Sequence, residues 1–331
     1  MTVAAPFSAA ALAIDAPRVA ADIEGAMRRA VFERLGRRGI VLGLSGGVDS
    51  SVVVGLAARA LGADRVIGLL MPEADSSPDS LRLGRVAADA FGVRTIVEDI
   101  SEVLTAAGCY RRRDEALRAV MPEYGPGYRC KLVLPDMIGR SAYSIHGVTV
   151  STPAGEEKHI RLTADAYLGI VAATNFKQRV RKMMEYHYAD RFRLAVAGTP
   201  NLLEHDQGFF VKNGDGSADL KPIAHLYKSQ VYQIAAYLGV PEEIRRRLPT
   251  TDTYPLEQSQ EEFYFTLPYD KMDMCLYGLN HGVPASEVAA AAGLTAEQVE
   301  RVYKDIAQKR RTTHYLHARP LLVDAVTEVH D

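Results

Sequence analysis

Cysteine is scarce in this 331-residue sequence: Cys109, Cys130 and Cys275 are the only ones, and they lie far apart. No Cys-x-x-Cys pair occurs, so neither a cysteine zinc site nor a thioredoxin-like redox pair is indicated. The sparse, odd number fits a reducing compartment, and we expect a cytoplasmic protein. We expect the three thiols to be small buried side chains without a covalent catalytic role.

Long hydrophobic runs and an excess of one charge are also lacking. No apolar stretch is long enough to cross a bilayer. The apolar N-terminal stretch Ala9–Ile14 has no basic region before it and is followed by Asp15 and Asp22, so a signal peptide is not expected. Lys and Arg number 39 against 41 Asp and Glu, a net charge of −2. Membranes and nucleic acids are therefore not expected as partners.

Apolar runs of strand length alternate with helical patterns along much of the chain. The runs lie at 40–44, 66–71, 93–100 and 194–197, and the helical patterns at 17–35, 51–61 and 79–91. Such alternation predicts parallel pairing with right-handed crossovers. The expected fold class is therefore α/β, with a doubly wound, mostly parallel sheet and a helical C-terminal part.

The alternation is interrupted between Thr105 and Leu162. There the runs Ile145–Val150 and Lys158–Leu162 flank a turn at Pro153–Gly155 and predict a hairpin. A long helix is expected from Thr163 to Tyr188. We therefore divide the chain into four segments: residues 1–104 and 163–250 as the two halves of the α/β domain, 105–162 as an insertion, and 251–331 as a helical region.

A phosphate-binding pattern follows the first apolar run. The loop Ser45–Ser51 reads Ser-Gly-Gly-Val-Asp-Ser-Ser and leads into a predicted helix. Its glycines allow close approach of a ligand, and the helix N-terminus favours an anion. The Gly-Lys-Ser/Thr ending of a Walker A loop is absent. Asp49, expected on an exposed loop, offers Mg²⁺ an oxygen ligand beside the phosphates. The alternative is a plain strand-to-helix turn with a capping aspartate.

A second polar constellation follows the predicted strand at 194–197. Thr199 and Glu204 can supply a hydroxyl to a nucleotide and a second oxygen to Mg²⁺. Lys212 precedes a Gly-Asp-Gly turn and Lys228 opens the next predicted helix, where lysines can balance phosphate charge. The alternative is a polar surface loop. A non-catalytic nucleotide-binding protein need not keep this set of acids and lysines together, so an enzyme is favoured.

Together these motifs resemble the NAD synthetase family of the ATP-pyrophosphatase (PP-loop) superfamily. The resemblance covers about residues 21–92 and 175–250, with a weaker match at Lys309. The matching motifs occur in the family's order: Ser45–Ser51, Met71–Pro72 with Ser76 and Ser77, Asn175–Arg181, Gly198–Glu204, Phe209–Gly216 and Pro249–Thr250. The resemblance implies an adenine nucleotide alpha hydrolase-like sheet. It also implies amidation of deamido-NAD to NAD by ATP and ammonia through an acyl-adenylate, releasing AMP and pyrophosphate.

The resemblance further implies a role for each matching residue. ATP would be bound by Gly43, Leu44, Ser45, Gly46, Gly47, Val48, Asp49, Ser50, Thr199, Lys228 and Thr250. Mg²⁺ would be held by Asp49 and Glu204. Deamido-NAD would be contacted by Arg179, Lys212, Asp219 and Lys309. Catalysis would fall to Asp49, Lys212 and Lys228, which position the reactants and balance charge without a covalent step.

Three departures make the chain a divergent member. They are the insertion at 105–162, the changed stretch Thr250–Gln258, and Gln308 in place of the family's histidine. All three concern the acceptor side, so the alternative is a related ligase that adenylates a different carboxylic acid. No glutaminase segment is recognisable, so nitrogen would come from ammonia or from a separate glutaminase. The family implies a homodimer, for which the helices at 17–35 and 163–188 are the candidate contacts.

Overall fold

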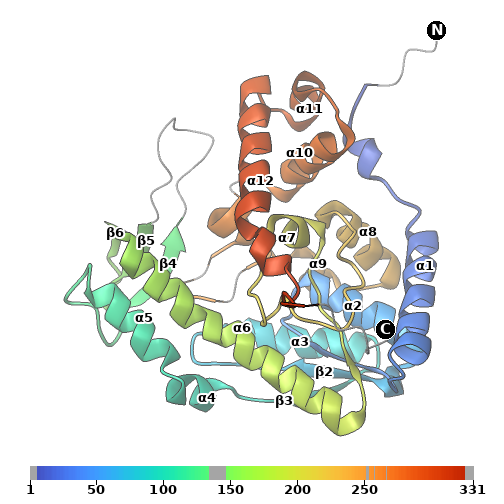
Figure 1. Cartoon of the computed structure of the whole chain (residues 1–331), viewed down its shortest axis with the longest axis horizontal. Coiled ribbons are helices and arrows are strands. Elements are labelled where there is room, and N and C mark those ends of the chain that lie inside the picture. The colour runs from blue at the N-terminus through green and yellow to red at the C-terminus, as the bar shows by residue number, and fades with distance from the viewer. Residues whose placement is uncertain (1–5, 134–146, 251–252, 257, 266, 325–331) are drawn as a thin grey trace.

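The computed structural model describes residues 6–133, 147–250, 253–256, 258–265 and 267–324 (Figure 1). Ile145 and His146 of the predicted hairpin, and Thr251, Asp252 and Glu257 of the changed stretch, lie outside these residues. A four-stranded sheet forms the centre, in the order β3-β2-β1-β7. Its strands are β1 (Ile40–Gly43), β2 (Val66–Leu70), β3 (Arg94–Val97) and β7 (Ala195–Val196). All three pairs are parallel, which confirms the predicted sheet.

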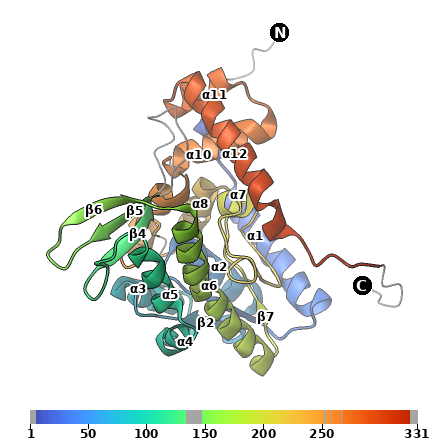
Figure 2. The same ribbon diagram turned by 60° about the vertical axis from the view of Figure 1, so that its left-hand side comes forward.

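Helices cover both faces of this sheet, as Figures 1 and 2 show. One face packs on α1 (Ala16–Arg28), α2 (Val48–Leu61), α3 (Pro78–Ala90), α8 (Lys228–Leu238) and α9 (Glu242–Arg246). The other packs on α4 (Ser101–Ala106), the start of α5 (Cys109–Arg118) and α6 (Ala164–Phe192). In β1, Ile40 and Leu42 face the first group and Val41 the second, and all three are fully buried. Burial on both faces explains why β1 reads as a continuous apolar run.

The predicted insertion contains a small antiparallel sheet in the order β4-β5-β6. Its strands are β4 (Arg129–Val133), β5 (Gly147–Ser151) and β6 (Glu157–Arg161). The pairing of β5 with β6 forms the predicted hairpin. Strand β4 and helix α5 of this segment, and helix α4 just before it, were not predicted. Val148 and Val150 pack with Ile170 of α6 in a separate apolar cluster. The insertion is therefore anchored on the first half of α6.

The C-terminal part is helical, as expected. Its elements are η4 (Glu261–Phe265), α10 (Tyr269–His281), α11 (Ala285–Ala292) and α12 (Ala296–His317), and they share an apolar cluster with Leu203 of α7 (Leu202–Gln207). The short helices η1 (Ala9–Leu12), η2 (Arg29–Arg34) and η3 (Ala63–Arg65) complete the described elements. Among the described helices, none is both long and apolar enough to cross a membrane.

The lower end of α12 lies against the segment that follows α7 (Figure 1). Gly208 has a φ of +72°, and a Cβ there would lie 2.3 Å from Cβ of Thr313 on α12. Only glycine allows this approach. The contact brings the end of α12 to the carboxyl edge of the central sheet.

Candidate active site

A cavity of about 770 Å³ opens at the carboxyl ends of β1 and β2, where parallel sheets bind ligands. Its walls come from the loop after β1, the loop after β2, the middle of α6, the segment after α7 and the end of α12. The insertion contributes Leu132, Val133 and Gly147. The loop after β1 and the predicted insertion therefore line one cavity.

The loop after β1 is tightly packed. Gly46 has a φ of +75°, and a Cβ there would lie 2.8 Å from Leu83 Cβ and from the Ser80 carbonyl oxygen. Gly47 caps α2, which begins at Val48, earlier than predicted. The Ser51 hydroxyl donates to the Gly47 carbonyl at 2.8 Å. The first turn of α2 therefore presents its backbone N–H groups at the edge of the cavity, as a phosphate site requires. Gly46 and Ser51 are outside the lining, whereas the other predicted ATP contacts of this stretch are in it: Gly43, Leu44, Ser45, Gly47, Val48, Asp49 and Ser50.

Asp49 lies in the first turn of α2, and its side chain is only 16% exposed. The prediction of an exposed loop was wrong, because the helix starts before this residue. Its Oδ2 forms an ion pair with the fully buried Nζ of Lys228, and its Oδ1 accepts from Nδ2 of Asn201 at 3.2 Å. Burial by itself lowers the pKa of Lys228, but the charges of Asp49 and Glu204 outweigh it and raise that pKa. Lys228 is thus held behind Asp49, outside the lining of the cavity.

Glu204 is the second carboxylate at this point. Burial, followed by the nearby charge of Asp49, raises the pKa of Glu204 to about 8, although Lys228 opposes the shift. A carboxylate whose charge is disfavoured by a second carboxylate nearby fits a site for a divalent cation. No group of three or more His, Cys, Asp or Glu side chains with metal-ligand geometry occurs among the described residues. Asp49 and Glu204 would therefore share Mg²⁺ with phosphate oxygens and water, which is usual for this ion.

Asn201 links the two carboxylates and is not among the residues predicted from the sequence. It is fully buried, and its Oδ1 accepts from the N–H groups of Leu203 and Glu204, which caps α7. Its own N–H donates to Oε2 of Glu204 at 3.1 Å. With its Nδ2 on Asp49, Asn201 contacts both candidate metal ligands. Its N-cap position before Glu204 was the available signal.

Three of the four residues predicted to contact deamido-NAD line the cavity, and the fourth does not. Arg179, Lys212 and Lys309 line the cavity, as do Thr199 and Thr250 on the predicted ATP side. Lys212 donates to the carbonyl oxygens of Tyr315 at 2.7 Å and Ala318 at 3.1 Å. Lys309 pairs with Asp305 at 2.8 Å, and burial lowers the pKa of Lys309. Both lysines are thus held in place by α12 and the residue that follows it.

Asp219 and Gln308 lie outside the lining. The Asp219 carboxylate accepts from the Val196 N–H at 2.8 Å and from the Tyr186 hydroxyl at 3.3 Å, so it braces strand β7 instead of facing the cavity. Gln308 is exposed on α12. The loss of the family's histidine therefore falls at a position that does not line this cavity.

A buried ion pair on α6 also lines the cavity, and the sequence analysis missed it. Lys182 Nζ lies 2.5 Å from Oε2 of Glu185. A Cβ at Gly43 would lie 3.0 Å from Oε1 of Glu185, so this pair is next to the end of β1. Burial raises the pKa of Glu185, and Lys182 opposes the shift. The spacing of Gln178, Lys182 and Glu185 on one helix face was the available signal.

The chain is similar to known proteins in sequence and in fold. The family model described as NAD synthase matches residues 19–119 and 154–315. The chain is similar to the NH(3)-dependent NAD(+) synthetase of Mesorhizobium japonicum, with 60% identity over 311 residues, 94% of this chain and 98% of that protein.

Two solved structures are similar in fold. The NMN synthetase from Francisella tularensis has a TM-score of 0.64 and 19% identity, and the match covers 95% of this chain and all of that one. The NH3-dependent NAD synthetase from Campylobacter jejuni in complex with nitrate has a TM-score of 0.61 and 20% identity, covering 94% of this chain and all of that one.

Proposed function

The chain belongs to the NAD synthase family, as an ammonia-dependent NAD synthetase that converts deamido-NAD to NAD, and we propose how its cavity divides that work. The observation that carries the proposal is the meeting of Asp49, Glu204 and Lys228 at the N-terminus of α2. A helix N-terminus, two carboxylates and a buried cation together suit a triphosphate with its counter-ion.

ATP occupies the end of the cavity formed by Gly43–Ser50, with Thr199 and Thr250 as further contacts. Asp49 and Glu204 hold Mg²⁺, which when bound neutralises charge on the departing pyrophosphate. Lys228 fixes the direction of Asp49 and adds positive potential behind it. Gly46 supports the loop from outside the lining.

Deamido-NAD occupies the other end, where Arg179, Lys212 and Lys309 balance its charge. Its nicotinate carboxylate attacks the α-phosphorus of ATP, so an oxygen–phosphorus bond forms and the bond to the bridging oxygen of pyrophosphate breaks. Ammonia then attacks the acyl carbon, the carbon–oxygen bond to AMP breaks, and the nitrogen loses a proton. No protein nucleophile is needed, so the residues act by positioning and charge. Asp219 acts indirectly, through strand β7 and Tyr186.

The test is the stoichiometry of the reaction. Purified protein with ATP, Mg²⁺, an ammonium salt and deamido-NAD is expected to form NAD, AMP and pyrophosphate in equal amounts. Chelation of Mg²⁺ by EDTA should stop pyrophosphate release and excess Mg²⁺ should restore it. Undiminished turnover in EDTA would show that the reaction does not need Mg²⁺. Pyrophosphate release with another carboxylic acid but not with deamido-NAD would show that deamido-NAD is not the substrate.

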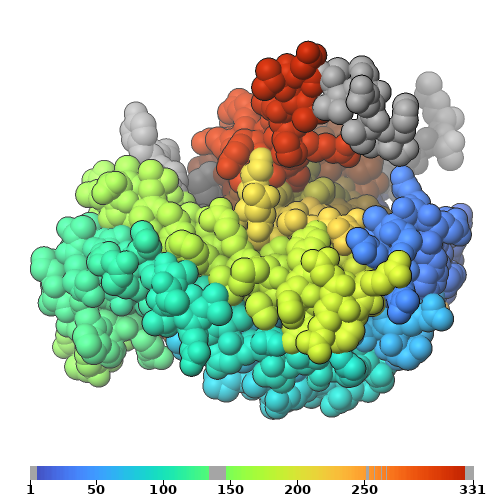
Figure 3. All heavy atoms as spheres, turned by 60° about the horizontal axis from the view of Figure 1, so that its bottom comes forward, coloured from blue at the N-terminus to red at the C-terminus, as the bar shows by residue number. Residues whose placement is uncertain are grey.

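We also propose a cytoplasmic homodimer that takes up ammonia either free or from a separate glutaminase. Figure 3 shows a face on which α6, in yellow-green, lies at the surface beside the teal segment that includes α4 and α5. Leu168 and Met183 of α6 are 62% and 53% exposed, which is more than large apolar side chains usually are. Light scattering after size exclusion should give twice the chain mass, and Met183→Asp should shift it toward the monomer. A monomeric wild-type protein would contradict this.

A further inference from the structure

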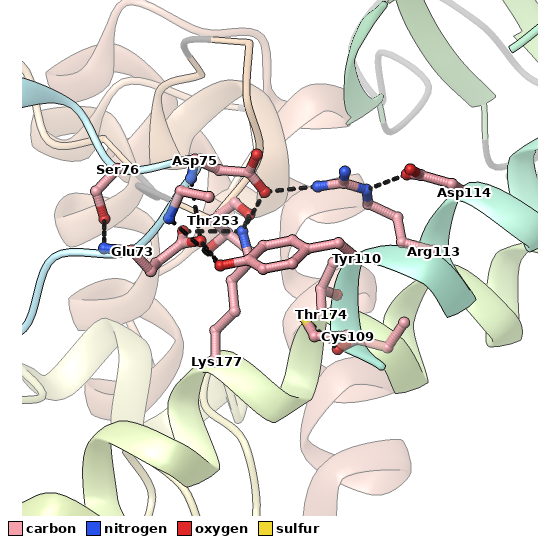
Figure 4. Close-up of polar contacts among 12 residues, drawn as sticks. Glu73, Asp75, Ser76, Cys109, Tyr110, Arg113, Asp114, Thr174, Lys177 and Thr253 are labelled. Carbon is pink, nitrogen blue, oxygen red and sulfur yellow. Dashed lines mark hydrogen bonds and ion pairs between the residues drawn. The ribbon is translucent and has the colours of Figure 1, made fainter. Parts of the chain in front are cut away.

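Lys177 lies in the middle of α6, behind the wall of the cavity, and is completely buried. Its Nζ contacts Oε1 of Glu73 at 2.9 Å, Oδ2 of Asp75 at 2.7 Å and the carbonyl oxygen of Thr253 at 2.7 Å (Figure 4). An ammonium group has three N–H donors, so all of them are used. Among the described residues, the hydrogen bonds and ion pairs of Lys177 go to none of those assigned to ATP or deamido-NAD.

The three groups that accept hydrogen bonds from Lys177 belong to two segments that line the same cavity. Glu73 and Asp75 lie in the loop after β2, which contributes Pro72 and Ser76 to the lining. This loop is also tied internally, because the Glu73 N–H donates to Oγ of Ser76 at 3.1 Å. Thr253 itself lines the cavity, and Thr250 of the same stretch is a proposed ATP contact. Lys177 therefore connects helix α6 to two walls of the cavity, the loop after β2 and the segment at Thr253.

Helix α5 holds the same loop from the other side. The Tyr110 hydroxyl donates to Oε2 of Glu73 at 2.8 Å, and Nη1 of Arg113 lies 2.5 Å from Oδ2 of Asp75. Figure 4 shows both side chains reaching from α5 toward the two acids. The helical part of the segment predicted as an insertion thus braces the loop after β2.

Lys177 and Arg113 meet Glu73 and Asp75 in a deeply buried network, and Arg113 also pairs with the more exposed Asp114 at 2.9 Å. Lys177 and Glu73 are fully covered, and the Asp75 and Arg113 side chains are 12% and 8% exposed. A buried ion network is seldom more stable than an apolar core of the same volume. An apolar side chain at this position could not form the three hydrogen bonds by which Lys177 holds two separate loops. An arginine would not supply them either, because its donors lie in one plane.

We propose that Lys177 is a positioning residue that sets the affinity for ATP by fixing the loop after β2 and the Thr253 segment at a constant separation. This inference rests on the proposed placement of ATP at the Gly43–Ser50 end of the cavity. Lys177 acts through these two loops and has no contact with the reacting atoms.

The test is the double variant Lys177→Met with Glu73→Gln. It removes one positive and one negative charge, so the pair of Asp75 and Arg113 stays balanced while the link to Thr253 is lost. The Kd for α,β-methylene-ATP, which cannot be cleaved at the reacting bond, and the KM for ATP should both rise about tenfold. The KM for deamido-NAD at saturating ATP should change by less than about twofold.

Val288→Ala in α11 is the control for general destabilisation, because Val288 is fully buried and outside the cavity lining. It should lower the Tm and leave both KM values unchanged. If the double variant does not fold, Tyr110→Phe replaces it, since only one hydroxyl is lost. We then expect a rise of about threefold in the Kd for the analogue.

An unchanged Kd in a folded variant, or equal rises in both KM values, would overturn the inference. Failure of the wild-type protein to bind the analogue would instead overturn the placement of ATP, and the inference with it. The two failures are therefore distinguishable.

Discussion

The fully buried ammonium group of Lys228 forms an ion pair with the carboxylate of Asp49 in the first turn of α2. One of these groups lines the cavity and the other supports it from behind. A substitution of Asp49 therefore alters the chemistry of the site and also leaves a buried charge without its main partner.

Asp49→Asn should abolish pyrophosphate release and also destabilise the protein. An uncompensated buried charge costs about 3 to 5 kcal/mol, so the Tm should fall by several degrees, contrary to what an exposed position would give. Adding Lys228→Met should restore most of the Tm and none of the turnover. Calorimetry and a pyrophosphate assay measure the two effects. An Asp49→Asn protein with the wild-type Tm would mean that Lys228 does not depend on this partner.

Asn201→Ala should weaken both the helix cap and the metal site. Loss of the cap of α7 costs about 1 kcal/mol, and loss of Nδ2 leaves Oδ1 of Asp49 without this hydrogen bond, although Oδ2 stays paired with Lys228. Asn201→Ser is the matched variant, since serine also caps helices but does not reach Asp49 as a donor. It should recover the Tm while the Mg²⁺ concentration for half-maximal activity stays raised. Equal Mg²⁺ requirements in Asn201→Ser and wild type would show that the amide does not act on Asp49.

Asp273 should make stability depend on pH. It caps α8 by accepting from the N–H groups of Lys228 at 3.1 Å and Ser229 at 2.6 Å. Burial raises the pKa of Asp273 from 3.8 to about 6, against the lowering effect of these hydrogen bonds. The folded protein therefore binds more protons than the unfolded chain between these values, so the stability from this group is full below about pH 4 and is lost as pH rises through about 6.

The measurement is the Tm of wild type minus that of Asp273→Asn at several pH values. This difference should shrink between about pH 4 and pH 7, because the variant keeps one capping oxygen and has no titrating group. A difference that grows with pH would give the opposite sign and refute the assignment.

The central sheet and the tight turn after β1 were predictable because their signals are local. Strand β1 is buried on both faces, so it reads as an uninterrupted apolar run, and Gly46 marks the turn that follows it. Helix α5 was missed because its sequence, from Cys109 to Arg118, is dominated by charged residues. Asn201 and Lys182 were missed for another reason: an N-cap position and a spacing on one helix face do not reveal that these side chains lie beside Asp49 and in the cavity wall.

Two departures from the family pattern turn out to be one structural unit. The Leu256 N–H donates to the Cys130 carbonyl oxygen at 3.2 Å, and Nε2 of Gln258 donates to the Leu132 carbonyl oxygen. The changed stretch after Thr250 therefore packs on strand β4 of the insertion. Residues more than 120 positions apart in sequence cannot reveal such a pairing by their own patterns, because it depends on tertiary contact alone.

Lys212→Met should loosen the end of α12 and weaken binding of deamido-NAD. In the structure Lys212 holds the carbonyl oxygens of Tyr315 and Ala318, and its ammonium lies 4.3 Å from the Tyr315 ring centre. Loss of these bonds should release the last turn of α12 from the cavity. The KM for deamido-NAD should then rise about tenfold or more, since a charged hydrogen bond is worth about 1.5 to 3 kcal/mol.

The control for this variant is Lys304→Met, because Lys304 is exposed on the same helix. Limited trypsin digestion should cut the Lys212→Met protein faster after Arg310 and Arg311, and the control at the wild-type rate. If Lys212 acts only on the reacting groups, its loss should lower kcat while digestion stays at the wild-type rate. Faster digestion together with a raised KM would show that the end of α12 is part of the acceptor site, because the proteolysis reports the helix and the KM reports the substrate.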